Sequence, residues 1–128
     1  MSSMNIIGQG VGSIDIDLIN GVKARLKNLV GIYVASLDGL LVSYIGAGDP
    51  DKWAALTATL AALGSTYVKE MSNLTAGNHR HIYTLIQSDK GFIINFRLND
   101  YAVTIIDDNP DELNTAVSLI TSSLTGKQ

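Results

Sequence analysis

The chain has 128 residues, of which 46% are hydrophobic and 16% charged, with twelve acidic residues against nine Lys and Arg and no cysteine. This length favours a single domain with a true hydrophobic core, and the composition is the reverse of that of a disordered chain. Without cysteine, disulfides and cysteine-based zinc sites are excluded, and a net charge of −3 argues against a nucleic-acid-binding protein.

The chain shows no recognisable targeting or membrane-spanning segment. Residues 1–12 lack the basic start and apolar run of a signal peptide. The uncharged stretch at residues 53–68 is shorter than the roughly 20 residues that span a bilayer, and it contains several Thr, Ser and Gly residues. We therefore expect a protein of the cytoplasm with no membrane span.

The first part of the domain is expected to contain one helix and one β-hairpin. Acidic residues near the start, basic residues near the end and an apolar stripe predict a helix over residues 15–29. Two short β-branched and aromatic segments follow, at residues 30–37 and 40–45. Asp38–Gly39 between them is a strong signal for a two-residue hairpin turn, because Asp-Gly readily adopts positive φ.

The rest of the chain predicts two more helices around a three-stranded meander. Asp49 as cap and Pro50 at the first helical position begin a helix that continues to about residue 73. Short turns separate three strands at about residues 81–87, 92–97 and 101–107. Asn109 and Pro110 then open a last helix in the same way as Asp49 and Pro50.

This order of elements predicts an α/β sandwich, in which one five-stranded sheet carries helices on both faces. The topology is helix, two strands, helix, three strands, helix. We expect one domain over residues 13–125, between a flexible N-terminal tail at residues 1–12 and a short C-terminal tail at residues 126–128.

The second predicted helix is apolar on two sides. Leu56, Leu60, Leu63, Tyr67 and Met71 form one stripe, and Ala54, Ala58, Ala61, Ser65 and Val68 form another. No charged residue lies between Lys52 and Lys69, whereas a surface helix ordinarily has one charged face. Because a single sheet covers only one side of a helix, we expect self-association to cover the other.

The strand predicted near His81 supports the same interpretation. In a simple topology it lies at an edge of the sheet, and residues 82–86 contain none of the Pro or Lys residues that usually protect an edge. An unprotected edge beside a two-faced apolar helix is what a dimer joined through its sheets requires.

No pattern of catalytic residues is present, so we expect a protein that is not an enzyme and has no catalytic residue, metal or cofactor. His79 and His81 have the spacing of a metal pair in a strand, but no third ligand is evident. Arg80 and Arg97 are read as solubilising charges rather than as arginine fingers, and no nucleotide-binding P-loop occurs. The acidic cluster near the last helix is read as caps and partners of the helix dipole: Asp107, Asp108, Asp111 and Glu112.

The segment Gly31-Ile-Tyr-Val-Ala-Ser-Leu-Asp-Gly-Leu-Leu-Val-Ser43, followed by a long Ala-rich helix and a three-stranded meander, resembles the roadblock family of dynein light chains and bacterial gliding-motility polarity proteins. The resemblance covers about residues 14–124. It implies an antiparallel sheet with strand order 2-1-5-4-3, the second helix on one face, and the first and third helices on the other.

The resemblance also implies dimerisation through the second helix and third strand, with docking of a Ras-like small GTPase on the paired helices. The implied dimer interface comprises Trp53, Leu56, Thr57, Leu60, Ala61, Gly64, Tyr67, Val68, Ile82, Tyr83, Thr84, Leu85 and Ile86. Few polar groups lie on the helix, so the candidate docking residues are at its ends: Asp51, Lys52, Lys69 and Glu70.

The function expected first is therefore that of a non-enzymatic homodimeric scaffold that binds a Ras-like small GTPase and can modulate its nucleotide cycle, similar to a GTPase-activating protein. The alternative is a structural adaptor or light chain without nucleotide dependence. A third hypothesis is a small-molecule sensor of profilin-like or PAS-like shape, for which Asn95 and Thr104 are the only polar hints among the strands.

Overall fold

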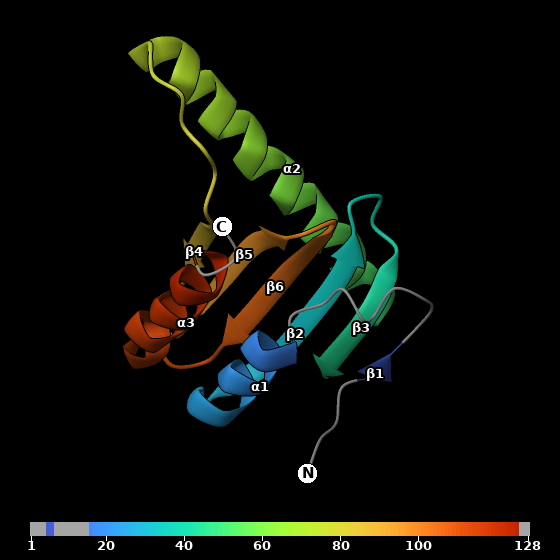
Figure 1. The fold of residues 1–128 in the computed structure, drawn as a ribbon. Helices are drawn as coiled ribbons and strands as arrows, with labels where there is room; N and C mark the ends of the chain where they lie inside the picture. Colours follow the sequence, from blue (N-terminus) through green and yellow to red (C-terminus); the bar gives the residue numbers. More distant parts are fainter. Residues whose placement is uncertain (1–4, 7–15, 126–128) are drawn as a thin grey trace.

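The computed structural model describes residues 5–6 and 16–125, which form one antiparallel sheet with helices on both faces (Figure 1). The elements in chain order are β1 (Asn5–Ile6), α1 (Ile16–Arg25), β2 (Leu29–Ser36), β3 (Leu41–Gly46), α2 (Pro50–Thr75), β4 (Thr84–Gln87), β5 (Phe92–Leu98), β6 (Tyr101–Asp107), the 3₁₀ turn η2 (Pro110–Glu112) and α3 (Leu113–Thr125).

The sheet has the order β1-β3-β2-β6-β5-β4. Its five longer strands are the five that the sequence predicts, in the predicted order, and the α/β sandwich is confirmed. In Figure 1, α1 and α3 lie together over one face of the sheet, and α2 crosses the other face and projects past its end. Within the described part of the chain, no helix combines the length and apolar character needed to cross a membrane.

The main hydrophobic core lies between the sheet and the α1/α3 layer. Alternate residues of β5 point into it, and the large side chains of Phe92, Ile94 and Phe96 are almost completely buried there. Val22 of α1 and Ile120 of α3 close the core from the helix side. This alternation also points the other residues of β5, among them Asn95, toward α2.

Several boundaries differ from the prediction. The first helix ends at Arg25 rather than at Leu29, because Leu29 already begins β2 and pairs with Asp107. The strand expected from His81 begins only at Thr84, and the His81 side chain before it lies beside Gly64 of α2. The last helix opens with the 3₁₀ turn η2.

The N-terminal tail contains a short element that the sequence did not predict. Asn5 and Ile6 form β1 and pair with Tyr44 and Ser43 of β3, so these two residues extend the sheet rather than belonging to a free tail. The other residues of the predicted tail, and the predicted C-terminal tail at residues 126–128, lie outside the described residues.

Candidate functional site

Helix α2 packs on the sheet with its smallest residues. Ala54, Thr57, Ala61 and Gly64 recur at helical spacing and are the buried residues of the helix. Their small size brings the helix close to the strands. The consequence is that the bulky residues of α2 have no partner within the described part of the chain on the opposite side.

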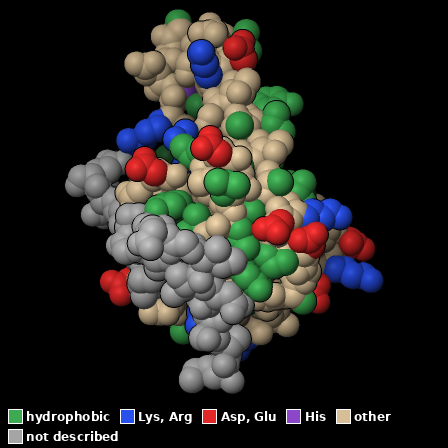
Figure 2. Space-filling model, turned by 90° about the vertical axis from the view of Figure 1, so that its right-hand side faces the viewer, with side chains coloured by type: hydrophobic (Ala, Val, Ile, Leu, Met, Phe, Trp, Pro, Cys, Tyr) green, Lys and Arg blue, Asp and Glu red, His purple; other side chains and the backbone are tan. Residues whose placement is uncertain are grey.

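These bulky residues form what we call the α2 outer face: Leu56, Leu63, Tyr67, Met71 and Leu74. Their side chains are 41–87% exposed, with Tyr67 at 75% and Leu74 at 87%. Figure 2 looks onto the side that carries α2 and the β2–β3 turn, and it shows hydrophobic side chains open to solvent there, between charged groups. Large contiguous apolar surfaces of this kind mark interaction sites on proteins.

Three residues of the predicted dimer interface point inward in the protomer. Thr57, Ala61 and Gly64 face the chain's own sheet and are buried within the protomer, so no partner can reach them. Of the other predicted interface residues, the exposed ones are Leu56, Tyr67, Ile82, Leu85 and Ile86, and the half-buried ones are Trp53, Leu60, Val68, Tyr83 and Thr84.

A buried polar network joins α2 to the sheet. The Thr57 hydroxyl donates to the Thr104 hydroxyl at 2.7 Å, and the Asn95 amide donates to the Thr57 carbonyl and to Thr104 Oγ1, both at 3.1 Å. The two polar residues that suggested a ligand pocket therefore bind the helix. Asn95 and Thr104 are therefore engaged in holding the helix, although Thr104 also lines a pocket beside α2.

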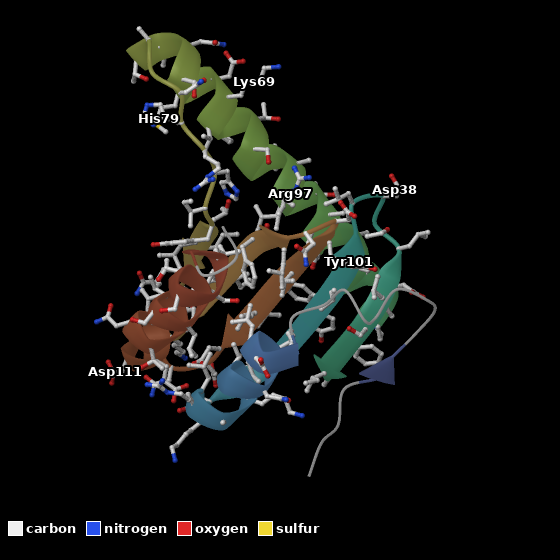
Figure 3. All side chains as sticks on the ribbon, in the orientation of Figure 1. Asp38, Lys69, His79, Arg97, Tyr101 and Asp111 are labelled. Atoms are coloured by element: carbon white, nitrogen blue, oxygen red, sulfur yellow. The ribbon has the colours of Figure 1, made fainter. Side chains whose placement is uncertain are left out.

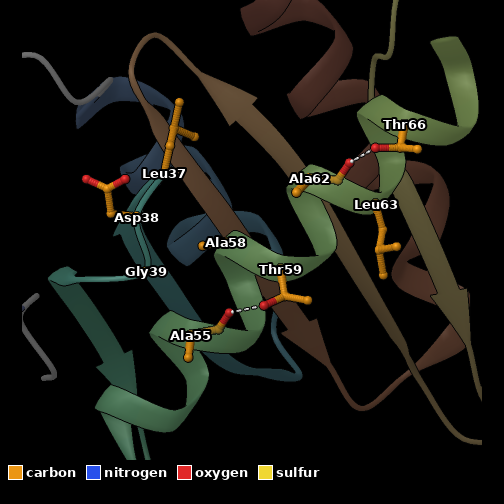
Figure 4. A pocket seen from close by; sticks show the side chains of 9 residues that line it. All are labelled: Leu37, Asp38, Gly39, Ala55, Ala58, Thr59, Ala62, Leu63 and Thr66. Carbon is orange, nitrogen blue, oxygen red and sulfur yellow. Dashed lines mark hydrogen bonds between the residues drawn. The ribbon is translucent and has the colours of Figure 1, made fainter.

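Two hollows lie on either side of α2. The first, which we call the hairpin groove, has a volume of about 490 Å³ and lies between the β2–β3 turn and the helix (Figure 4). Its walls are formed by Leu37, Asp38, Gly39, Ala55, Ala58, Thr59, Ala62, Leu63 and Thr66. Thr59 and Thr66 turn their hydroxyls back onto the helix carbonyls of Ala55 and Ala62, so the helix wall offers mainly carbon to a partner.

The second hollow, the edge pocket, has a volume of about 280 Å³ and lies between α2 and the strands β4 and β5. Its lining is apolar except for two threonines: Trp53, Leu56, Thr59, Leu60, Leu63, Ile86, Ile93 and Thr104. Beside it, β4 is the edge strand of the sheet and pairs only with β5, as the sequence predicts. Leu85 and Ile86 of this strand are exposed, so the apolar surface continues from the helix to the sheet edge.

The four predicted docking residues are exposed but lie far apart. Asp51 and Lys52 belong to the first turn of α2, where the Asp49 side chain accepts hydrogen bonds from both their backbone amides. Lys69 and Glu70 follow about 18 residues later, which corresponds to roughly 27 Å along a helix. The structure therefore places the two pairs at the flanks of the α2 outer face and does not unite them in one site.

The two histidines, considered above as a metal pair, each form a hydrogen bond with a threonine. His79 Nε2 lies 2.9 Å from Thr75 Oγ1, and His81 Nε2 lies 2.7 Å from Thr84 Oγ1, so each ring is held by its own threonine. Among the described residues, no three His, Asp or Glu side chains are placed to hold a metal ion.

In the acidic cluster, Asp111 and Glu112 lie in the first turn of η2 as dipole partners would, but the cap is the neighbouring Asn109, and one acidic residue is unexpected. The Asn109 side chain caps η2, and Glu112 accepts hydrogen bonds from the backbone amides of Lys27 and Asn28 in the α1–β2 turn. Asp107, in contrast, is 2% exposed, and its Oδ2 has no hydrogen-bond partner among the described residues. Burial, reinforced by the neighbouring Glu112 carboxyl, raises the pKa of Asp107 to about 7.

Sequence reasoning missed the hairpin groove, although its parts were visible. The Asp38–Gly39 turn and the alanines of the second helix were each recognised for local reasons. Only the fold brings them together. Gly39 faces Ala55 and Ala58 so closely that a Cβ added to it would be in ordinary van der Waals contact with both.

The sequence of the chain matches a known family but no individual curated protein. The family model of the Roadblock/LC7 domain matches residues 20–106. No curated protein sequence matches the chain at a significant level.

Solved structures of the same fold include a Roadblock/LC7 domain from Streptomyces avermitilis, which is 17% identical, has a TM-score of 0.62, and covers 86% of this chain and 93% of its own. MglB from Myxococcus xanthus is 16% identical with a TM-score of 0.57 and 94% coverage of both chains. The gliding protein MglB from Thermus thermophilus is 13% identical with a TM-score of 0.62, over 92% of this chain and 88% of its own. The family match spans well over half of the sequence, and the chain belongs to the Roadblock/LC7 family.

Proposed function

We propose that this protein is a non-enzymatic, homodimeric regulatory module of the cytoplasm, which binds a Ras-like small GTPase and can modulate its nucleotide cycle. The observation that carries the proposal is the α2 outer face. A helix that turns its small residues to its own sheet and its leucines, tyrosine and methionine to solvent is half of an interface.

The second copy is assigned to the edge-pocket side of α2. Leu56 and Leu60 of the helix and Ile86 of β4 form one apolar surface there, continuous with an edge strand whose outer backbone groups are open to pairing. A two-fold axis through such a surface joins two sheets and two helices at once, and it uses the same patch on both protomers.

The GTPase is assigned to the surface that the dimer leaves open, which includes the hairpin groove. The identity of this partner as a Ras-like GTPase follows from the family resemblance. The groove supports it physically, because its apolar helix wall and the exposed Asp38 at its rim offer both contact area and one charged anchor. Without a committed catalytic side chain, this module would act on hydrolysis by rearranging the partner's own residues.

The dimer is tested with a pair of matched substitutions. Leu56→Glu places a charge in the proposed seam, whereas Leu40→Glu places the same charge on the β2–β3 turn, where Leu40 is also open to solvent. We expect wild type and Leu40→Glu to have the mass of a dimer by light scattering at micromolar concentration, and Leu56→Glu to have the mass of a monomer, because a charge buried without a partner is strongly unfavourable. A monomeric wild-type protein would contradict the proposed assembly.

Binding of a GTPase is tested by affinity capture from the native lysate, once with a non-hydrolysable GTP analogue and once with GDP. The expected result is a Ras-like GTPase enriched in one nucleotide state, with capture reduced by a charge in the groove, Ala62→Glu. Hydrolysis assays with the captured GTPase then measure the effect on its cycle. A partner captured equally in both states would favour the second candidate, a structural adaptor or light chain that the same apolar surfaces could serve.

A further inference from the structure

A third hollow lies near the projecting end of α2, away from the two apolar ones. It has a volume of about 360 Å³ and lies between the C-terminal half of the helix and the segment that returns toward β4. We call it the cationic pocket. Its lining is Ser65, Val68, Lys69, Ser72, Asn73, Asn78, His79, Arg80 and His81. Figure 3 labels Lys69 on the helix and His79 on the returning segment beside it.

The charge of this pocket is opposite to that of the protein. The whole chain carries a net charge of −3, yet both of its histidines, one lysine and one arginine line this hollow, and no Asp or Glu is among the described residues of its lining. Arg97 of β5 is close enough to act on the same region: burial and then the charge of Arg97 lower the pKa of His81. Basic side chains at or near this pocket therefore come from the helix, the returning segment and the sheet.

The walls of the pocket are held in place by hydrogen bonds. The Thr75 hydroxyl donates its only proton to the Met71 carbonyl, so the His79 ring must donate through Nε2 to Thr75 Oγ1. The Ser72 hydroxyl donates to the Val68 carbonyl and accepts from the His79 amide. The segment is thus fixed to the helix. The cationic side chains of Lys69 and Arg80 and the amides of Asn73 and Asn78 complete the polar lining.

The helix dipole does not account for the position of Lys69. Basic residues stabilise a helix through its C-terminal carbonyls only within the last turn, and the last turn of α2 contains none. Lys69 lies six residues before the end of the helix at Thr75, where the dipole no longer acts on it. The arrangement of two long cationic side chains and two amides around a polar hollow is instead the chemistry that recognises anionic oxygens.

We propose that the cationic pocket is a binding site for a phosphate-type oxyanion. A volume of about 360 Å³ has room for more than one phosphoryl group, given that a water molecule takes up about 30 Å³ of liquid. The site is independent of the proposed GTPase partner, because neither the hairpin groove nor the edge pocket shares a residue with it.

The test is a titration of the protein with pyrophosphate at constant ionic strength, followed by amide and imidazole NMR signals. We expect shifts concentrated in residues 65–81, saturable binding, and weaker binding of inorganic phosphate, which brings less charge. Lys69→Gln combined with Arg80→Gln should weaken pyrophosphate binding by about tenfold or more, since two charge-assisted hydrogen bonds are lost. Both side chains are exposed, and thermal unfolding of the variant checks that its fold is retained.

The matched control removes the same charge at another place. Lys23→Gln combined with Lys27→Gln changes two lysines of the α1 region and should leave the pyrophosphate affinity unchanged. The proposal is overturned if residues 65–81 show no saturable shifts, or if both double variants weaken binding equally, which would mean that the anion senses only the overall charge of the protein.

Discussion

The two faces of the sheet use opposite rules for burying side chains. The α1/α3 face buries large aliphatic and aromatic residues such as Phe96 and Ile120, and it is complete within one chain. The α2 face buries alanine, threonine and glycine, and it leaves its large residues in solvent. One face thus holds the closed core of the protomer, and the other leaves an apolar surface exposed, which is the surface proposed here for partners.

The largest expected difference between the faces is in the effect of removing a large side chain. Phe96→Ala should lower the free energy of unfolding by about 3–5 kcal/mol, because it opens a cavity in a fully packed core. Leu74→Ala, on the exposed end of α2, should change it by less than about 0.5 kcal/mol. Denaturant unfolding of both variants measures this. Equal losses would mean that the α2 face also has a closed core.

The faces also differ in charge, because the α1/α3 side buries the carboxyl of Asp107. The pKa of Asp107 is about 7 in the folded protein and 3.8 when it is unperturbed, so the folded state holds the proton more tightly. Its contribution to stability is therefore complete below about pH 4 and is lost as the pH rises through 7. We expect Asp107→Asn to gain on the order of 2 kcal/mol relative to wild type between about pH 5 and pH 8.

The control for this experiment is an exposed carboxyl at the other end of β6. Asp100→Asn removes a carboxyl that is not among the groups acting on Asp107, so the difference in stability between this variant and wild type should not change with pH as it does for Asp107→Asn. The lowered pKa of Glu112, caused first by its contact with Asp107 and then by its backbone hydrogen bonds, acts in the opposite direction. A pH dependence of Asp107→Asn identical to that of wild type would show that the buried acid is not the group that titrates.

The two faces also differ in how closely a glycine of the covering helix is packed. A Cβ on Gly64 of α2 would lie 2.5 Å from both His81 Nε2 and Thr84 Oγ1, whereas a Cβ on Gly21 of α1 would meet only Leu119 at an ordinary 3.5 Å. Gly64→Ala should therefore destabilise by about 1–2 kcal/mol and speed amide exchange in residues 79–84. Gly21→Ala should stabilise by about 0.5–1 kcal/mol through helix propensity. Thermal unfolding with hydrogen exchange measures both, and a stabilising Gly64→Ala would rule out the close packing of the returning segment.

The smallest expected effect concerns the polar network under α2. Thr57→Val keeps the shape of the side chain but removes the 2.7 Å hydrogen bond to Thr104, and should lower the free energy of unfolding by about 1 kcal/mol. Thr59→Val, two residues along the same helix, removes only an exposed hydroxyl that bonds back to Ala55. It should be neutral in the same denaturation assay. If the two substitutions have equal effects, the network does not anchor the helix.

The order of the elements could be predicted from the sequence because each has a local signal. Asp49–Pro50 and Asn109–Pro110 mark helix starts, Asp38–Gly39 marks the hairpin, and these signals depend on neighbouring residues only. The orientation of α2 could not be predicted in the same way. With apolar residues on two sides, the pattern does not tell which stripe meets the sheet, and the prediction therefore mixed Thr57, Ala61 and Gly64 into an outward surface.

The acidic cluster and the edge strand show the same limit. Asp107 has the pattern of a cap, and only the packing of η2 and the α1–β2 turn around it reveals a buried carboxyl. Residues 81–83 have the composition of a strand, but the His81 side chain lies beside Gly64, which is distant in sequence, and the strand begins only at Thr84. Local patterns predict elements well, and competition between distant contacts decides where they stop.

The segment between α2 and β4 is shared between the helix and the sheet edge. His79 and His81 of this segment lie against the helix, and the edge strand that follows pairs with β5 only from Thr84 to Gln87. Because β4 begins only at Thr84, residues 96–98 of β5 have no ladder partner on that side within the described part of the chain. In the proposed dimer, the edge strand available for pairing is therefore only four residues long.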